Sequence, residues 1–136
     1  MLYQIDVDYG LENERICQIK IEHFFNQKLN KLDYYNDYDF TNDNNNLLIE
    51  LKSRRCKITD YSDTMISISK INKAKKLVKN KDKKFEIYFF FYYLQNDLYY
   101  WKFDDKIVLR LDNNCNYRGI RKQYAYIPTH LLTKIN

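Results

Sequence analysis

Two different spacings of apolar residues mark the first third of the chain. Over residues 11–32, apolar side chains recur every three or four positions, which predicts a long amphipathic helix. A weaker alternation of apolar and polar residues over 2–7 indicates a short first strand. Residues 33–46 are acidic and rich in asparagine, so we expect a strand in this segment only around 38–41.

The middle of the chain predicts a strand, a helix and a second strand. Residues 47–53 begin with three consecutive apolar residues and are predicted to form a strand. Residues 54–63 should form a loop, and the polar residues near its end can cap a helix over 65–79. Residues 85–94 are aromatic and β-branched, which is typical of a central strand.

Shorter segments complete the chain. Residues 98–103 and 106–111 are predicted to form a hairpin across a pair of aspartates. Residues 123–127 should form the last strand, which ends at the single proline. This order of elements predicts one α/β or α+β domain over residues 1–136, with a mixed central β-sheet flanked by helices.

The composition predicts a folded chain with an excess of positive charge. Hydrophobic residues make up 45% and aromatic residues 17% of the sequence, which argues against disorder. The net charge of +5, from 23 basic and 18 acidic side chains, is compatible with a polyanionic partner. The lysines are concentrated over residues 70–84, which contain eight lysines and one acid.

The cysteines and the apolar runs indicate a cellular compartment. The chain has three cysteines, Cys17, Cys56 and Cys115. They are odd in number, far apart and without a CxxC pair, which favours free thiols in a reducing compartment over disulfides or a zinc site. The sequence opens without the pattern of a signal peptide, and its best apolar run, residues 87–94, has the length of a strand. We therefore expect an intracellular protein, of the cytoplasm or nucleus, or a virus-encoded one, without a membrane partner.

Glu50 and Lys52 stand out because they interrupt the apolar strand predicted over 47–53. Strand side chains alternate between faces, so these two point to the same side. A half-buried strand rarely carries two opposite charges on one face unless they contact something there. Asp39 lies eleven residues upstream of Glu50, in an acidic segment. An acid, a gap and Glu-X-Lys on a strand form a pattern that can hold a divalent metal beside a lysine.

This pattern resembles the active-site signature of the PD-(D/E)XK nuclease superfamily. The resemblance covers about residues 10–94 and is strongest over 39–55. It implies a restriction-endonuclease-like core, here with an added C-terminal β-hairpin. It also implies a nuclease that hydrolyses phosphodiester bonds in DNA with Mg²⁺ or Mn²⁺. The chain departs from the family pattern at the proline that usually precedes the acid, where it has Tyr38.

The resemblance assigns roles to particular residues. Asp39 and Glu50 would be the carboxylate ligands of the metal, and the backbone carbonyl of Leu51 a further ligand. Lys52 would lie near the attacking water, orient it and stabilise developing charge. In many relatives a glutamate on the first helix completes the site, and Glu14 is the first candidate for this catalytic role. The alternatives to Glu14 are Glu12 and Glu22, and all three also fit the wet face of an amphipathic helix.

Three acids compete for the position upstream of Glu50. Asp39 is preferred because Tyr38 and Phe40 flank it, and alternation would aim its carboxylate away from both rings. Asp37 would share the face of Asp39, whereas Asp43 lies among asparagines and is predicted to be a turn residue.

Basic residues around the motif are candidates for contacts to nucleic-acid phosphates. Lys70 and Lys73 lie three positions apart on the predicted second helix, where relatives place a phosphate contact, although a solvated lysine face explains them equally well. Arg54 and Arg55 follow the motif strand directly and would flank the mouth of the cleft.

A second function fits the same sequence. The chain could be a non-catalytic nucleic-acid-binding module that uses its basic helix, 64–79, to hold the polymer. Convergence of Asp39, Glu50 and Lys52 would favour catalysis, and carboxylates that splay apart would favour the binding module. An interaction protein without a nucleic-acid role would need the lysine helix to face away from Glu50. The sequence does not distinguish DNA from RNA as the substrate, or a monomer from a homodimer.

Overall fold

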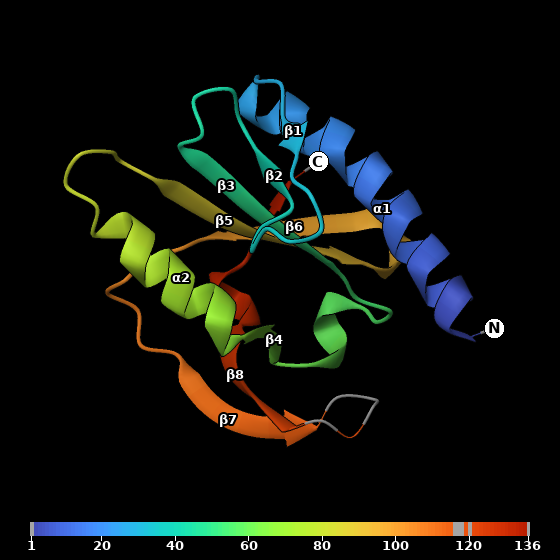
Figure 1. Cartoon of the computed structure of the whole chain (residues 1–136). Coiled ribbons are helices and arrows are strands. Elements are labelled where there is room, and N and C mark those ends of the chain that lie inside the picture. The colour runs from blue at the N-terminus through green and yellow to red at the C-terminus, as the bar shows by residue number, and fades with distance from the viewer. Residues whose placement is uncertain (1, 116–118, 120, 136) are drawn as a thin grey trace.

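The structure, a computed structural model, describes residues 2–115, 119 and 121–135, with the backbone alone for 2–8, 114 and 115. Two helices pack against a mixed sheet, and a second, smaller sheet lies below it in Figure 1. Helix α1 spans Leu2–Phe25 and helix α2 spans Ile68–Val78. The described chain therefore has an α+β fold compatible with a restriction-endonuclease-like core, as the sequence predicts.

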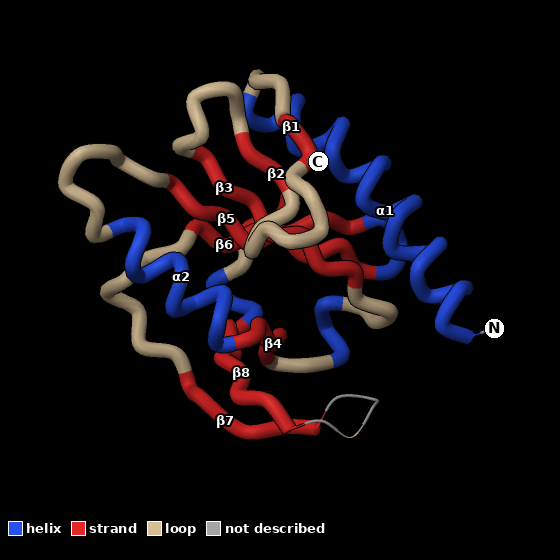
Figure 2. The backbone as a smooth tube through the Cα atoms, viewed as in Figure 1, coloured by secondary structure: helices blue, strands red, loops and turns tan. Residues whose placement is uncertain are grey.

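Six strands form the larger sheet, in the order β1-β2-β3-β5-β6-β9. Their bounds are Asn30–Lys31 (β1), Phe40–Thr41 (β2), Leu47–Ser53 (β3), Glu86–Tyr93 (β5), Asp97–Lys102 (β6) and Thr133–Ile135 (β9). Strands β3 and β5 are parallel, and the other neighbours are antiparallel. The parallel pair requires a long crossover connection, and the segment that contains α2 provides it (Figure 2). The strands predicted over 47–53 and 85–94 are confirmed.

Strand β5 contributes side chains to a separate hydrophobic core on each face of this sheet. Phe89 and Phe91 pack in the core that includes residues of α2, and Phe90 and Tyr92 pack in the core that includes residues of α1. The Phe89 ring stacks on Trp101 of β6, with ring centroids 5.9 Å apart. The sequence of β5 is aromatic at consecutive positions because both of its faces are covered.

Helix α1 differs from the predicted helix at both ends. Residues 2–7, predicted to be a strand, form its first turns, and the helix ends at Phe25 instead of residue 32. It ends there because Asn26 adopts a left-handed conformation, with a φ of 52°. Leu29 still packs in the α1 core from the following loop, where its amide donates to Glu22 Oε2 at 2.8 Å. The hydrophobic spacing therefore correctly marks Cys17, Ile21 and Leu29 as buried, but it is wrong for Phe24, which is exposed, and for the extent of the helix.

The second sheet was not predicted. It consists of β4 (Asp63–Ser67), β8 (Arg121–Pro128) and β7 (Arg110–Cys115), in the antiparallel order β4-β8-β7. The helix predicted from residue 65 begins at Ile68 because the preceding residues pair with β8. Thr64 and Ile66 are buried in this pairing, whereas Met65 between them is exposed, which is the alternation of a strand.

The C-terminal hairpin exists but involves other strands. The pairing predicted between 98–103 and 106–111 is wrong, because β6 pairs with β5 and β9. Strand β7 instead forms a hairpin with β8 in the second sheet. Three short 3-10 helices connect strands, at Ile58–Asp60, Leu94–Asn96 and Thr129–Leu131. None of the helices in the described part of the chain has the length and apolar character needed to cross a membrane.

Cys17 and Cys56 are free thiols, as expected, and the side chain of Cys115 lies outside the described residues. Burial raises the pKa of Cys17 to about 12, so this thiol stays protonated and unreactive.

Candidate active site

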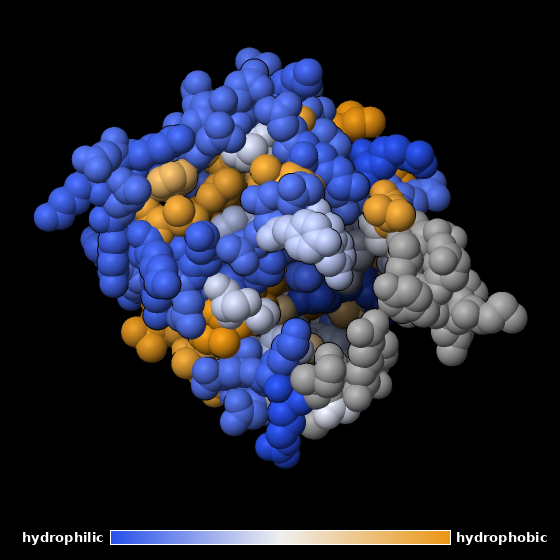
Figure 3. All heavy atoms as spheres, viewed as in Figure 1, coloured by the Kyte–Doolittle hydropathy of each residue, from blue (hydrophilic) through white to orange (hydrophobic). Residues whose placement is uncertain are grey.

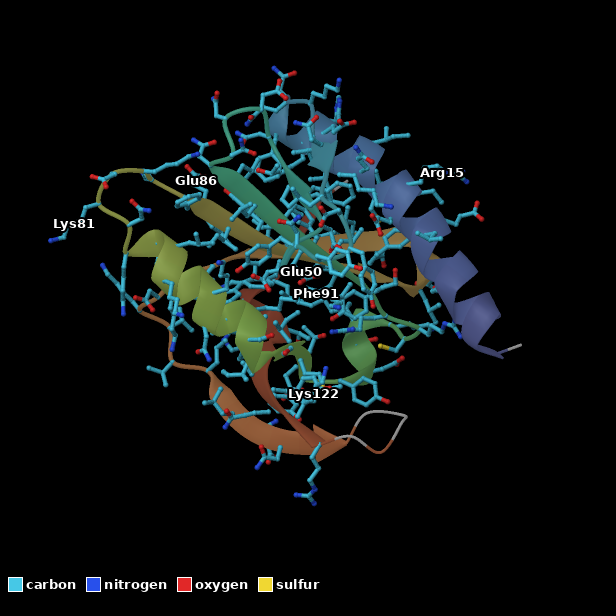
Figure 4. The ribbon with its side chains drawn as sticks, viewed as in Figure 1. Arg15, Glu50, Lys81, Glu86, Phe91 and Lys122 are labelled. Carbon is cyan, nitrogen blue, oxygen red and sulfur yellow. The ribbon has the colours of Figure 1, made fainter. Side chains whose placement is uncertain are left out.

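Asp39 and Glu50 lie side by side where β2 meets β3. The amide of Asp39 donates to the carbonyl of Ile49 at 2.8 Å, and the amide of Leu51 donates to Asp39 Oδ2 at 2.7 Å. These bonds fix the Asp39 carboxylate at the edge of β3. Glu50, in the middle of β3, is only 3% exposed and lies near the centre of the molecule in Figure 4. The two carboxyl groups are close enough for the charge of Asp39 to raise the pKa of Glu50.

Two lysines approach Glu50 from different elements. Lys52 comes from the same strand, and its Nζ is 3.9 Å from Glu50 Oε1. Lys70 comes from the first turn of α2, and its Nζ is 3.2 Å from Glu50 Oε2. Lys70 also donates to the backbone carbonyl of Asp37. Of the sequence candidates, Asp39, Glu50, Lys52 and Lys70 are thus brought together, and the lysine helix faces Glu50.

The electrostatics of this group favour a bound cation. Burial raises the pKa of Glu50, while Lys52 and Lys70 oppose the shift and the nearby Asp39 adds to it, so that the pKa is about 7. Glu50 Oε2 is buried and accepts no hydrogen bond from the described residues, although it is paired in charge with Lys70. Two adjoining carboxyl groups supply hard oxygen donors of the kind that Mg²⁺ and Mn²⁺ prefer.

The backbone of β3 can add a ligand to this set. The amide and the carbonyl of one strand residue point toward the same neighbour, so the Leu51 carbonyl lies on the side of Asp39. Among the described residues no group of three His, Cys, Asp or Glu side chains could hold a metal ion. A metal here would therefore be held by Asp39, Glu50, a backbone carbonyl and water.

The other acids near the motif have different partners. Asp37 is exposed and lies 4.0 Å from Lys73 Nζ. Asp43 is in the turn between β2 and β3, as predicted, where it accepts a hydrogen bond from the Asn30 amide at 2.8 Å. The structure thus favours Asp39 as the partner of Glu50.

Strand alternation does not explain the orientation of the Asp39 carboxylate, although it was predicted to do so. Tyr38 packs in the core on the α2 side, and Phe40 packs in the core on the α1 side, so the two rings do not share a face. Asp39 precedes β2, and its carboxylate is oriented by the amide of Leu51 instead of by strand alternation. Tyr38 also donates from its hydroxyl to the carbonyl of Lys70 at 3.0 Å, which ties the loop of Asp39 to α2.

The glutamates of α1 are engaged in local contacts. Glu14 Oε1 is 3.2 Å from Lys31 Nζ, Glu12 pairs with Arg15, and Glu22 accepts the amide of Leu29. No contact of Glu14 with Asp39 or Glu50 is found among the described residues. The catalytic role assigned to Glu14 stays a prediction.

Arg54 and Arg55 have different surroundings. Arg54 reaches the second sheet, where its Nε donates to Thr64 Oγ1 at 2.9 Å and its terminal nitrogen donates to the Met65 carbonyl at 2.6 Å. It also lies over the Phe91 ring, 5.5 Å from the centroid, and burial lowers its pKa. Arg55 is exposed and lies over the Tyr9 ring, 4.4 Å from the centroid. Arg54 therefore connects the two sheets.

Replacing Arg54 with alanine is expected to lower the free energy of unfolding by about 2 kcal/mol. The substitution removes two hydrogen bonds from a charged donor and leaves the Thr64 hydroxyl and the Met65 carbonyl with one partner fewer. Urea unfolding measures the change. Arg15→Ala is the matched control, because Arg15 is exposed on α1 and points away from the body of the protein in Figure 4. Equal stability of the two variants would contradict the connecting role of Arg54.

A cationic pocket opens beside Glu50. It has a volume of about 410 Å³. Its polar lining residues are Lys52, Arg54, Ser67, Lys70, Lys122 and Tyr124. The face shown in Figure 3 is hollowed near its centre, with hydrophilic atoms at the bottom, close to where Figure 4 labels Glu50. Lys122 and Tyr124 were not found from the sequence, because β8 reaches this pocket only through its pairing with β4.

Comparison with known proteins identifies the family of the chain. A family described as phage putative PDDEXK endonuclease matches residues 3–118. No curated protein and no solved structure matches the chain. The family description accords with the resemblance seen in the motif and with a virus-encoded protein. The match covers most of the sequence and includes Asp39, Glu50 and Lys52, so the chain belongs to the family of phage putative PDDEXK endonucleases.

Proposed function

We propose that this protein is a metal-dependent nuclease that hydrolyses phosphodiester bonds in DNA at the site formed by Asp39, Glu50 and Lys52. The observation that carries the proposal is the buried Glu50, which adjoins Asp39 and whose Oε2 has an ion pair with Lys70 but no hydrogen bond among the described residues. A buried carboxylate beside a second one is costly in a folded protein, and a bound cation lowers that cost.

The residues fit the hydrolysis of a phosphodiester. Mg²⁺ or Mn²⁺, when bound by Asp39, Glu50 and the Leu51 carbonyl, would make a water acidic and neutralise charge on the phosphate. Lys52 is 44% exposed, so its ammonium can orient the attacking water and stabilise the developing negative charge. The water gives up one proton to solvent as its oxygen bonds to phosphorus, one ester P–O bond breaks, and the leaving oxygen takes a proton from solvent.

Lys70 has a different role in this proposal from the phosphate contact first expected. Its ammonium lies against Glu50 and the Asp37 carbonyl and is 21% exposed. It therefore balances the charge of Glu50 and holds the loop of Asp39 against α2. Lys73 remains a candidate for a phosphate contact, because its side chain is 48% exposed.

The test is cleavage of plasmid, linear single-stranded and branched DNA with Mg²⁺ or Mn²⁺, compared with EDTA. We expect cleavage with metal and background levels in EDTA, because the two carboxylates alone cannot activate water. Asp39→Asn and Lys52→Gln should also lose activity. Asp43→Asn and Lys81→Gln are matched controls, since Asp43 is in a turn and Lys81 is exposed on the loop before β5 (Figure 4).

The same experiment addresses the non-catalytic binding module. The exposed lysines in the last turn of α2, Lys75 and Lys76, would support binding without cleavage. DNA binding without cleavage under any metal, unchanged by Asp39→Asn and Lys52→Gln, would exclude the nuclease and favour that alternative.

A further inference from the structure

A second pocket adjoins the cationic pocket beside Glu50. It has a volume of about 440 Å³, and Arg54 and Met65 line both pockets. Three tyrosines, Tyr61, Tyr93 and Tyr126, also line the second pocket, which we call the tyrosine pocket. The cationic pocket beside Glu50, lined by Lys52, Lys70 and Lys122, is called the lysine pocket below. Both lie between the end of β3 and the second sheet.

The tyrosine pocket contains a polar group that lacks a partner. Tyr93 is 5% exposed, and its hydroxyl makes no hydrogen bond with the described residues. The neighbouring Thr64 hydroxyl instead accepts a hydrogen bond from Arg54. Burial raises the pKa of Tyr93, so its hydroxyl stays a neutral donor. A buried hydroxyl without a partner in the lining of a pocket indicates a ligand with a polar edge.

The lysine pocket has the opposite character. Lys52, Lys70 and Lys122 bring ammonium groups from three different elements to a single pocket. Glu50 alone pairs with both Lys52 and Lys70, whereas no ion pair of Lys122 is found among the described residues. The pocket therefore has an excess of positive charge and fits an anionic group such as a phosphate.

We propose that the two pockets together hold one unpaired nucleotide, with its base in the tyrosine pocket and its phosphate in the lysine pocket. Aromatic rings bind the flat face of a base, and the Tyr93 hydroxyl can donate to a carbonyl or ring nitrogen on its edge. A base inside a duplex could not reach between the sheets. The inference rests on the proposed function, and it specifies the substrate as DNA with an unpaired nucleotide near the cleaved bond.

The test is binding in EDTA, where cleavage does not interfere. Two duplexes of one sequence are compared by fluorescence anisotropy, one fully paired and one with a single bulged 2-aminopurine. We expect the bulged duplex to bind about tenfold more tightly, and its 2-aminopurine emission to change on binding because the base enters an aromatic pocket. Equal affinity for the two duplexes would overturn the inference.

Substitutions in each pocket test which residues produce the preference for the bulged duplex. Tyr61→Ala removes an exposed ring and should reduce the preference for the bulged duplex to about one. Tyr93→Phe should also reduce it, yet leave the protein as stable as before or more stable, because it removes only a hydroxyl without a partner. A preference that survives both substitutions would place the base elsewhere.

Lys122→Gln should weaken binding of the bulged duplex and lower the dependence of log affinity on log salt by about one. Lys81→Gln makes the same change of charge on a distant loop and should have little effect (Figure 4). Equal effects of the two substitutions would show general charge attraction and would remove the lysine pocket from the inference. Because binding is measured without metal, a protein that fails to cleave DNA can still show the preference.

Discussion

Replacing Glu50 with glutamine is expected to lower the rate of metal-dependent DNA cleavage by about 10³-fold or more. The amide keeps the shape of the side chain but removes the negative charge that would hold the metal. It also ends the charge pairing with Lys52 and Lys70, whose positions depend on Glu50. Loss of a single preorganised electrostatic contact to a transition state costs about 10²–10³-fold, and the loss of a metal ligand should cost at least as much.

The measurement is single-turnover cleavage with saturating Mg²⁺. Glu86→Gln is the matched control, because Glu86 starts the adjacent strand β5, is half-buried and pairs with Lys102 at 3.4 Å. Figure 4 shows Glu86 near the opposite end of the sheet from the second sheet. Full activity in Glu50→Gln, or equal loss in the two variants, would contradict the proposed site.

The stability of Glu50→Gln separates catalysis from folding. Above pH 7 the wild-type protein keeps a buried carboxylate whose charged form burial disfavours. The glutamine variant has no buried charge at this position, so its free energy of unfolding at pH 8 should equal or exceed that of the wild type. If Glu50→Gln lost activity because it unfolds, its free energy of unfolding would be lower than that of the wild type. The proposed site would then be tested by Asp39→Asn and Lys52→Gln instead.

The active-site strand could be predicted because its signals are local. Three apolar residues, then Glu50 and Lys52 two positions apart, are enough to define strand β3 and the shared face of the two charges. Strand β5 is equally clear from its run of aromatic residues. The position of Asp39 beside Glu50 was also predicted, although the amide of Leu51 orients its carboxylate, and no local pattern shows such a bond.

The second sheet could not be predicted because its pairings join distant segments. Asp63 in β4 is paired with Pro128 in β8, and nothing in either segment alone identifies its partner. The role of Arg54 depends on the same pairing. From its place after the motif strand, it is predicted to contact the DNA backbone, and the hydrogen bonds of its guanidinium to Thr64 and Met65 could not be predicted. Both pockets of the proposed nucleotide site depend on this sheet and were missed for the same reason.

Glu50 should lower the stability of the metal-free protein by about 3 kcal/mol between pH 4.5 and pH 7. Burial raises the pKa of Glu50 from its ordinary value of 4.5 to about 7, and each pH unit corresponds to about 1.36 kcal/mol. In this window the folded protein keeps the Glu50 proton and the unfolded chain does not. The folded state therefore binds more protons, and its stability falls as the pH rises. Urea unfolding in EDTA across this range measures the contribution as the difference between wild type and Glu50→Gln.

A divalent metal should reverse this loss, because a cation bound by Asp39 and Glu50 can replace the proton on Glu50. At pH 8, Mg²⁺ should raise the Tm of the wild-type protein. The apparent affinity of the protein for Mg²⁺ should fall as the pH drops below 7, because the proton competes with the metal for Glu50. Glu50→Gln should show neither effect, whereas Glu86→Gln should show both. If Mg²⁺ stabilised Glu50→Gln as much as the wild type, the metal would bind elsewhere, and the raised pKa of Glu50 would be only a cost of burying a carboxylate. A metal effect confined to proteins that keep Glu50 would identify the same residue as the origin of the instability and as the ligand that relieves it.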